Sequence, residues 1–155
     1  STNHDYLDRI SGPGQLQQAM STLAIVAAEA AYNEGEEWLD QLVEYIDGTQ
    51  SFVEAFVREQ VPFVNVIKPE GTYLSWLDVG EALNKTGSTA SAASDESMTP
   101  EDVFQHYLVE HANIHINPGS NYGFGGAGRM RMNIATSRQL VELALNNMAN
   151  ALQRA

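Results

Sequence analysis

The chain has 155 residues, of which 43% are hydrophobic, and its 20 acidic and 8 basic side chains give a formal net charge of -12. A chain of this length can bury one proper core, while its acidic surface repels nucleic-acid phosphates and anionic lipids, so neither nucleic acid nor a membrane is an expected partner. The absence of cysteine excludes disulfides, thiolate metal sites and cysteine nucleophiles.

No apolar stretch is long enough for a membrane span, and the first residues lack the pattern of a signal peptide. We therefore expect a soluble protein, and a cytoplasmic location fits the lack of cysteine. Residue 1 is Ser and not Met, which favours a processed or excised piece of a longer chain.

Helices are predicted after a polar lead over residues 1–14. Apolar residues at three-to-four spacing indicate one helix over 15–32, with Asn33 and Gly35 as stop signals. A second begins near Glu36, where acidic side chains suit a helix N-terminus, and it extends to about residue 60.

Paired strands alternate with helices over the remaining residues, 61–155. β-branched and aromatic residues or period-two alternation predict strands over 63–67, 73–79, 113–117 and 129–135. Thr99 and Pro100 predict the start of a helix that reaches about His111. Thr136 or Ser137 caps a last helix, whose expected apolar face is Leu140, Leu143, Ala144, Met148 and Leu152. The pattern favours an α+β fold, a two-layer sandwich in which helices cover a small mixed or antiparallel sheet.

Residues 86–99 contain only small, polar and acidic side chains apart from Met98. Such a segment buries little apolar area, so we expect a mobile surface loop without regular structure.

Two apparent motifs carry little weight. Gly123, Gly125 and Gly128 have the spacing of a dinucleotide-binding loop, but a strand pattern follows where that loop needs a helix. His106 and His111 are five residues apart and diverge on a helix, so no metal site is expected. No acidic pair or serine has the context of a catalytic group, and we assign no catalytic residue.

Arg129 and Arg131 alternate on one predicted strand just after the glycine-rich segment, so both lie on the same face. An arginine on a rigid strand can bind a carboxylate through two parallel hydrogen bonds, as recognition of an amino acid requires. The pattern alone leaves this alternative and an ordinary surface arginine equally open.

Three collinear segments are recognisable: residues 69–78 (PEGTYLSWLD), 117–123 (NPGSNYG) and 128–135 (GRMRMNIA). In order and spacing they resemble the C-terminal small domain of class I/II, fold-type I, pyridoxal-phosphate-dependent aminotransferases, especially the cystathionine beta-lyase-like C-S lyases. Residues 27–39 resemble the long interdomain helices of that branch. The resemblance thus implies interdomain helices over 15–60 and an aminotransferase-like small domain over 61–155.

The resemblance implies a role for Arg131, which matches the family's arginine for the substrate α-carboxylate. Pro118, Gly119 and Tyr122 would border the active-site entrance. Arg129 stands where the branch often has another residue, and it receives no family role.

The family binds pyridoxal phosphate through a lysine of a large domain that precedes the matched region. This chain has only Lys68 and Lys85, both expected to be solvated, so no covalently bound cofactor is expected here and the isolated chain should be inactive. The resemblance implies an amino-acid substrate, a missing large domain and a homodimer for the intact enzyme. A stand-alone interaction or regulatory domain and a split enzyme remain alternatives, and transamination is not distinguished from β-elimination.

Overall fold

The computed structural model describes residues 21–95 and 97–155, so the predicted polar lead, with His4, lies outside the described residues. The described residues divide into two units, the first ending at residue 43 and the second beginning at residue 44. In the first unit, helix α3 (Thr22–Glu34) begins after Ser21, whose hydroxyl accepts a hydrogen bond from the Ala24 amide. The predicted helix over 15–32 is therefore seen from Thr22 on, and residues 15–20 lie outside the description.

Helix α4 (Glu36–Gln60) begins with two acidic residues, as predicted. Its last turns belong to the second unit, where Val53 and Val57 are fully buried. The assignment of residues 15–60 to interdomain helices and of 61–155 to a small domain stays a prediction.

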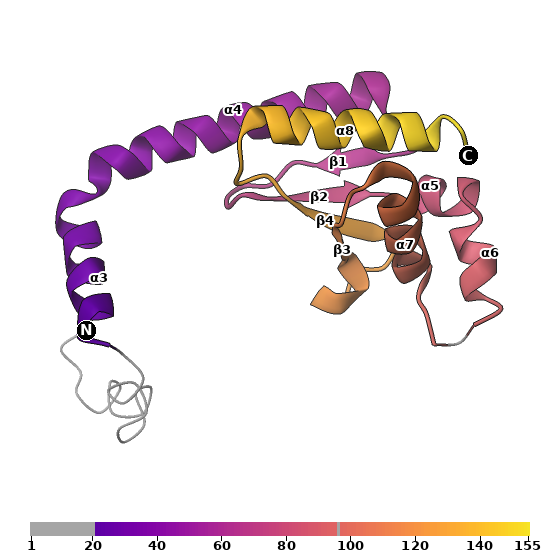
Figure 1. The fold of residues 1–155 in the computed structure, drawn as a ribbon, viewed down its shortest axis with the longest axis horizontal. Helices are drawn as coiled ribbons and strands as arrows, with labels where there is room; N and C mark the ends of the chain where they lie inside the picture. Colours follow the sequence, from indigo (N-terminus) through magenta and orange to yellow (C-terminus); the bar gives the residue numbers. More distant parts are fainter. Residues whose placement is uncertain (1–20, 96) are drawn as a thin grey trace. The chain divides into compact units, whose positions relative to one another are not determined.

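A four-stranded sheet organises the second unit (Figure 1). Its strands are β1 (Asn65–Ile67), β2 (Leu74–Asp78), β3 (Asn117–Pro118) and β4 (Arg129–Asn133). The spatial order is β1-β2-β4-β3, and every neighbouring pair is antiparallel. This arrangement confirms the predicted α+β class.

The strand predicted over 113–117 is shorter than expected. Asn113 takes a left-handed conformation with φ of 55° and caps the end of helix α7 (Pro100–Ala112), so Asn113 itself is not part of a strand. Gln105 of α7 donates a hydrogen bond to the carbonyl of Ile116, which leaves only Asn117 and Pro118 in the sheet.

Helix α7 begins as predicted: the Thr99 hydroxyl accepts from the Asp102 amide, and the Asp102 carboxylate accepts from the Thr99 amide. Helix α8 (Arg138–Leu152) begins after Ser137, one of the two predicted caps. The sequence did not predict α5 (Gly80–Lys85) or the 3-10 turn η1 (Gly119–Tyr122).

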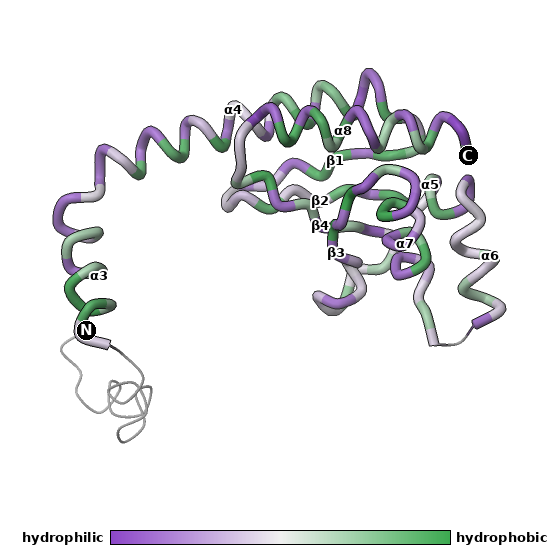
Figure 2. Tube along the Cα trace, viewed as in Figure 1, coloured by the Kyte–Doolittle hydropathy of each residue, from purple (hydrophilic) through white to green (hydrophobic). Residues whose placement is uncertain are grey.

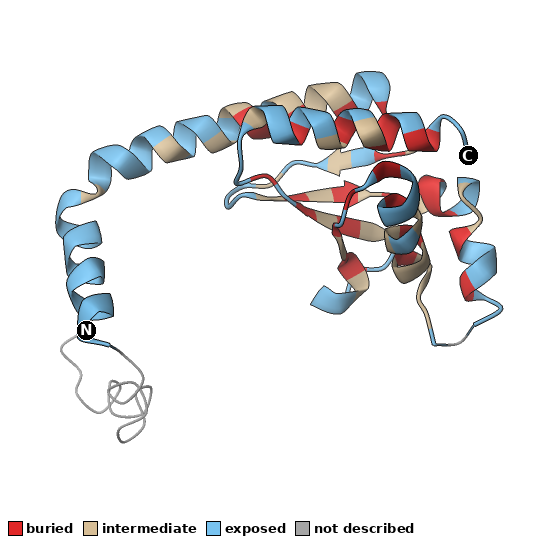
Figure 3. Ribbon diagram, viewed as in Figure 1, coloured by how far each residue is buried: buried red, intermediate tan, exposed pale blue. Residues whose placement is uncertain are grey.

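One face of the sheet and the helices enclose the core (Figure 3). Leu77 and Met130 of the sheet join Phe104 of α7 and Leu145 of α8 in one buried cluster. The alternate sheet residues point to the other face and stay partly exposed. The unit is therefore the two-layer sandwich that the sequence predicted.

The predicted apolar face of α8 is wrong in part. Leu140 and Leu143 are each 56% exposed, whereas Val141 and Leu145 are buried beside Met148 and Leu152. Residues 141, 145, 148 and 152 follow the helical period, and this stripe faces the core. Figure 2 shows the alternation of apolar and polar residues along α8.

The expectation of a segment without regular structure over 86–99 is also corrected. Residues Ser88–Ala92 form a short helix, α6, in which Ser88 and Ala92 are buried against the unit. Small side chains allow this close approach, and the Thr86 hydroxyl lies 2.8 Å from that of Ser88. The mobility of the segment stays a prediction.

Within the described residues, every helix is too short or too polar to cross a membrane.

Candidate functional site: an arginine beside a glycine-rich loop

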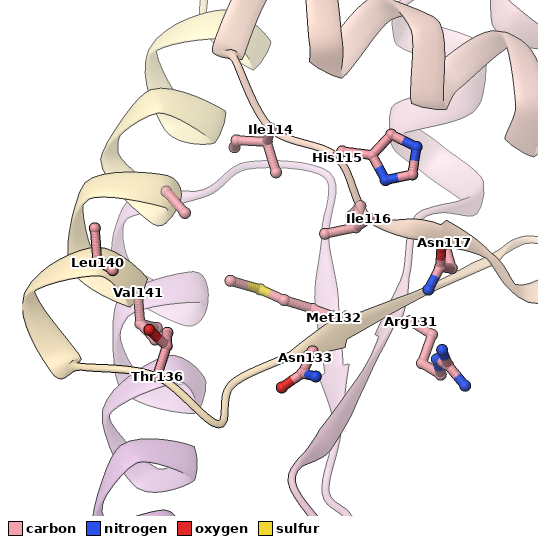
Figure 4. A pocket seen from close by; sticks show the side chains of 11 residues that line it. Ile114, His115, Ile116, Asn117, Arg131, Met132, Asn133, Thr136, Leu140 and Val141 are labelled. Atoms are coloured by element: carbon pink, nitrogen blue, oxygen red, sulfur yellow. The ribbon is translucent and has the colours of Figure 1, made fainter.

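Arg131 lies in the middle of β4, between two neighbouring strands. Its backbone is opposite Trp76 of β2 on one side and Asn117 of β3 on the other. Met130 and Met132 point into the core, so Arg129 and Arg131 share the opposite, partly exposed face, as the alternation predicted. In Figure 4 the side chains of Arg131 and Met132 point in opposite directions from the strand.

The guanidinium of Arg131 lies over the ring of Tyr122, with 4.1 Å from its central carbon to the ring centroid. Tyr122 in turn meets Trp76 edge to face, with 5.9 Å between the ring centroids. Such contacts hold a cation by the charge distribution of the ring, typically for about 0.5–1 kcal/mol at an exposed site. Tyr122, expected only to border the entrance, is thus in direct contact with the arginine.

Arg131 keeps hydrogen-bonding capacity for a ligand. Its Nε is buried and has no hydrogen-bond partner among the described residues, and no carboxylate of those residues forms an ion pair with it. An unpaired buried donor is unfavourable, and a bound carboxylate would satisfy it.

The glycine-rich segment is folded back on η1 by close backbone contact. Pro118 pairs with Met130 in the sheet, and Gly119 follows it with its backbone against that of Gly126. A Cβ on Gly119 would lie 2.4 Å from the Gly126 carbonyl oxygen and 2.6 Å from that of Arg129. This contact fixes the start of η1 and therefore the place of Tyr122.

A buried acid that the sequence analysis missed anchors the other end of the segment. Glu101, 3% exposed in the first turn of α7, accepts a hydrogen bond from the Gly128 amide directly before β4. The Gly128 carbonyl accepts from Val79, 2.9 Å away, and so completes the anchor. Nothing in the sequence pattern distinguishes Glu101 from the exposed acidic residues that also begin helices, such as Glu36.

A cavity of about 200 Å3 lies at the end of β4, between the strand and the start of α8. Apolar residues such as Ile114, Ile116 and Val141 line much of it. Arg131 and Asn133 of β4 also line it, so this cavity borders the strand that carries the guanidinium (Figure 4).

The motifs that were given little weight stay without function. The segment from Gly123 to Gly128 leads into strand β4 and not into a helix, so the dinucleotide-binding geometry is absent. Within residues 21–95 and 97–155, no three His, Asp or Glu side chains gather as metal ligands.

The two lysines do not fit a covalent cofactor. Lys68 is exposed in the turn after β1, and Lys85 is exposed at the end of α5, with its ammonium 5.7 Å from the centre of the Phe63 ring. A lysine that forms a Schiff base needs a desolvated site. The described residues therefore contain a candidate site for a carboxylate, and neither lysine has the desolvated environment that covalent attachment of pyridoxal phosphate requires.

A model of the family "Aminotransferase class I and II" matches residues 4–147. The chain belongs to this family. Among curated relatives, a putative cystathionine beta-lyase of Mycobacterium tuberculosis is 34% identical over 146 residues, covering 90% of this chain and 35% of the relative. Cystathionine beta-lyase PatB of Bacillus subtilis is 32% identical over 152 residues, covering 96% of this chain and 35% of the relative.

Solved structures of the aminotransferase and lyase group have the same fold. A pyridoxal-phosphate-bound putative aminotransferase from Clostridium difficile superposes with a TM-score of 0.70 at 33% identity, over 85% of this chain and 30% of that one. Cystalysin from Treponema denticola, which contains pyridoxal 5'-phosphate, gives 0.70 at 28% identity, over 86% of this chain and 30% of its own. The chain thus spans about a third of the length of its relatives.

Proposed function

We propose that this chain is the C-terminal portion of a pyridoxal-phosphate-dependent aminotransferase or C-S lyase and that Arg131 binds the α-carboxylate of the amino-acid substrate. The observation that carries the proposal is a guanidinium held on a rigid strand, oriented by Tyr122 and left without an ion-pair partner among the described residues. A planar guanidinium of this kind matches a carboxylate with two parallel hydrogen bonds.

The rest of the enzyme would supply the cofactor and its lysine. Pyridoxal phosphate carries the electron-withdrawing chemistry in such enzymes, and this portion would bind and orient the substrate and exclude water as the domains close. We further propose a cytoplasmic location, which fits the lack of cysteine, and a homodimer of the intact enzyme, which the resemblance implies. The stand-alone regulatory domain is less favoured, because the family model matches residues 4–147 and curated relatives of this chain are cystathionine beta-lyases.

The test is Arg131→Met in the complete enzyme, since Met keeps the contact with Tyr122 but removes the charge. Loss of two parallel hydrogen bonds between a guanidinium and a carboxylate weakens the binding free energy by about 2–5 kcal/mol. The catalytic efficiency kcat/KM should therefore fall by roughly 30-fold to several thousand-fold.

Arg58→Met is the matched control, because Arg58 lies on α4 with its side chain 72% exposed and, among the described residues, forms an ion pair only with Glu59. This control should leave kcat/KM unchanged. An Arg131→Met enzyme as active as the control would contradict the proposed role.

A further inference from the structure

A second recess lies on the same face of the sheet as Arg131. It has a volume of about 240 Å3, and its walls include Ile67, Trp76, Tyr122, Phe124 and Arg129. Tyr122 contacts Arg131 and also lines the recess, so the two places are adjacent. Arg129 and Arg131 are two positions apart on an extended strand, which separates their Cα atoms by roughly 6.5–7 Å.

The charge of Arg129 is not neutralised by its surroundings. Its Nη1 donates to the Gly125 carbonyl, and its Nε is buried without a partner among the described residues. Asp78 is its cross-strand neighbour, but the Asp78 carboxylate accepts from the Gly80 amide, and the described residues show no ion pair between the two side chains. Only 8 of the 155 residues are basic, so two adjacent arginines on one face form a local positive site in an acidic chain.

We propose that this recess is the subsite for the substrate side chain and that it selects amino acids with an apolar stem and a terminal carboxylate. The aromatic walls would contact the stem, and Arg129 would bind the distal carboxylate while Arg131 holds the α-carboxylate. The inference rests on the proposed function, because it takes Arg131 as the first anchor. In this proposal Arg129 determines the substrate specificity. Phe124, which is fully exposed, forms part of the wall of the recess.

The test measures by calorimetry how tightly glutarate and valerate bind to the complete enzyme. Both acids have the same number of carbon atoms, but only glutarate has a second carboxylate. The unchanged protein should bind glutarate more tightly. Arg129→Met should weaken glutarate binding roughly 10- to 100-fold, as expected for a charged hydrogen bond, and leave valerate within about 3-fold. Arg129→Lys keeps the charge and should retain part of the preference.

Each of the other outcomes would count against the subsite or against the proposed function. Equal weakening of both acids would mean that Arg129 acts only by holding the glycine-rich loop through Gly125, and this would overturn the subsite. No preference for glutarate in the unchanged protein, or a preference that survives Arg129→Met, would also overturn it. If Arg131→Met left valerate binding unaltered, the proposed function itself would fail, whatever the result at Arg129.

Discussion

The backbones of Gly119 and Gly126 lie so close that neither residue can carry a side chain without displacing the other. In Gly119→Ala, the new methyl group would meet the carbonyl oxygens of Gly126 and Arg129 at 2.4 and 2.6 Å. Both atoms belong to the main chain, so relief requires the loop to move. Overpacking of this kind typically lowers the free energy of unfolding by about 1–3 kcal/mol.

Gly71→Ala provides the matched control. An added Cβ there meets no atom within 4 Å, and the backbone of Gly71 is outside the left-handed region. It should be neutral or stabilise by up to about 1 kcal/mol, because alanine reduces the freedom of the unfolded chain. Urea unfolding of both variants gives the comparison through the midpoint and the slope. Equal stability of the two variants would refute the close approach of η1 to the glycine-rich segment.

Three further predictions concern buried polar groups and the lysines. Glu101→Leu leaves the Gly128 amide unpaired and should lower the free energy of unfolding by about 1–3 kcal/mol. Glu101→Gln keeps an acceptor and should lower it less. Equal losses of the two variants in urea unfolding would contradict the role of the hydrogen bond between Glu101 and Gly128. Burial raises the pKa of Tyr107 above 10.0, although Arg154 opposes this. The folded state thus favours the neutral phenol, so the contribution of Tyr107 is complete below its ordinary pKa of about 10 and is lost as the pH rises through the higher folded pKa. Tyr107→Phe should therefore lose stability less steeply as the pH rises above about 10, and an equally steep loss would argue against this. Borohydride trapping after addition of pyridoxal phosphate should give only low, scattered labelling of Lys68 and Lys85, and stoichiometric labelling of one of them would show a complete cofactor site in this chain.

The sequence predicted best the features that depend on neighbouring residues. The alternation of Arg129 to Met132 determined which side chains face the core, and the caps at Thr99 and Ser137 placed the starts of two helices. The last helix has two possible apolar stripes, one with Leu140 and Leu143 and one with Val141 and Leu145. The sequence does not tell which of the two is buried, because this depends on the position of the sheet.

Contacts between distant residues were not accessible from the pattern. Glu101 and Gly128 are 27 positions apart, and no periodicity links them. The helix at 88–92 was missed because serine and alanine lack an apolar pattern, although their small size is what allows them to pack closely. At the candidate site, the resemblance supplied Arg131, but the stacking of Tyr122 on its guanidinium required the fold.

The stacking of Arg131 on Tyr122 has a thermodynamic consequence for any anion that binds there. A free arginine side chain samples many rotamers, and fixing it removes about 2 kcal/mol of conformational entropy. The ring restricts the guanidinium before the ligand arrives, so part of this entropy is already lost in the folded chain. A carboxylate therefore meets donors that need little rearrangement, and replacing Tyr122 by a small residue should weaken the affinity of Arg131 even though its charge is untouched.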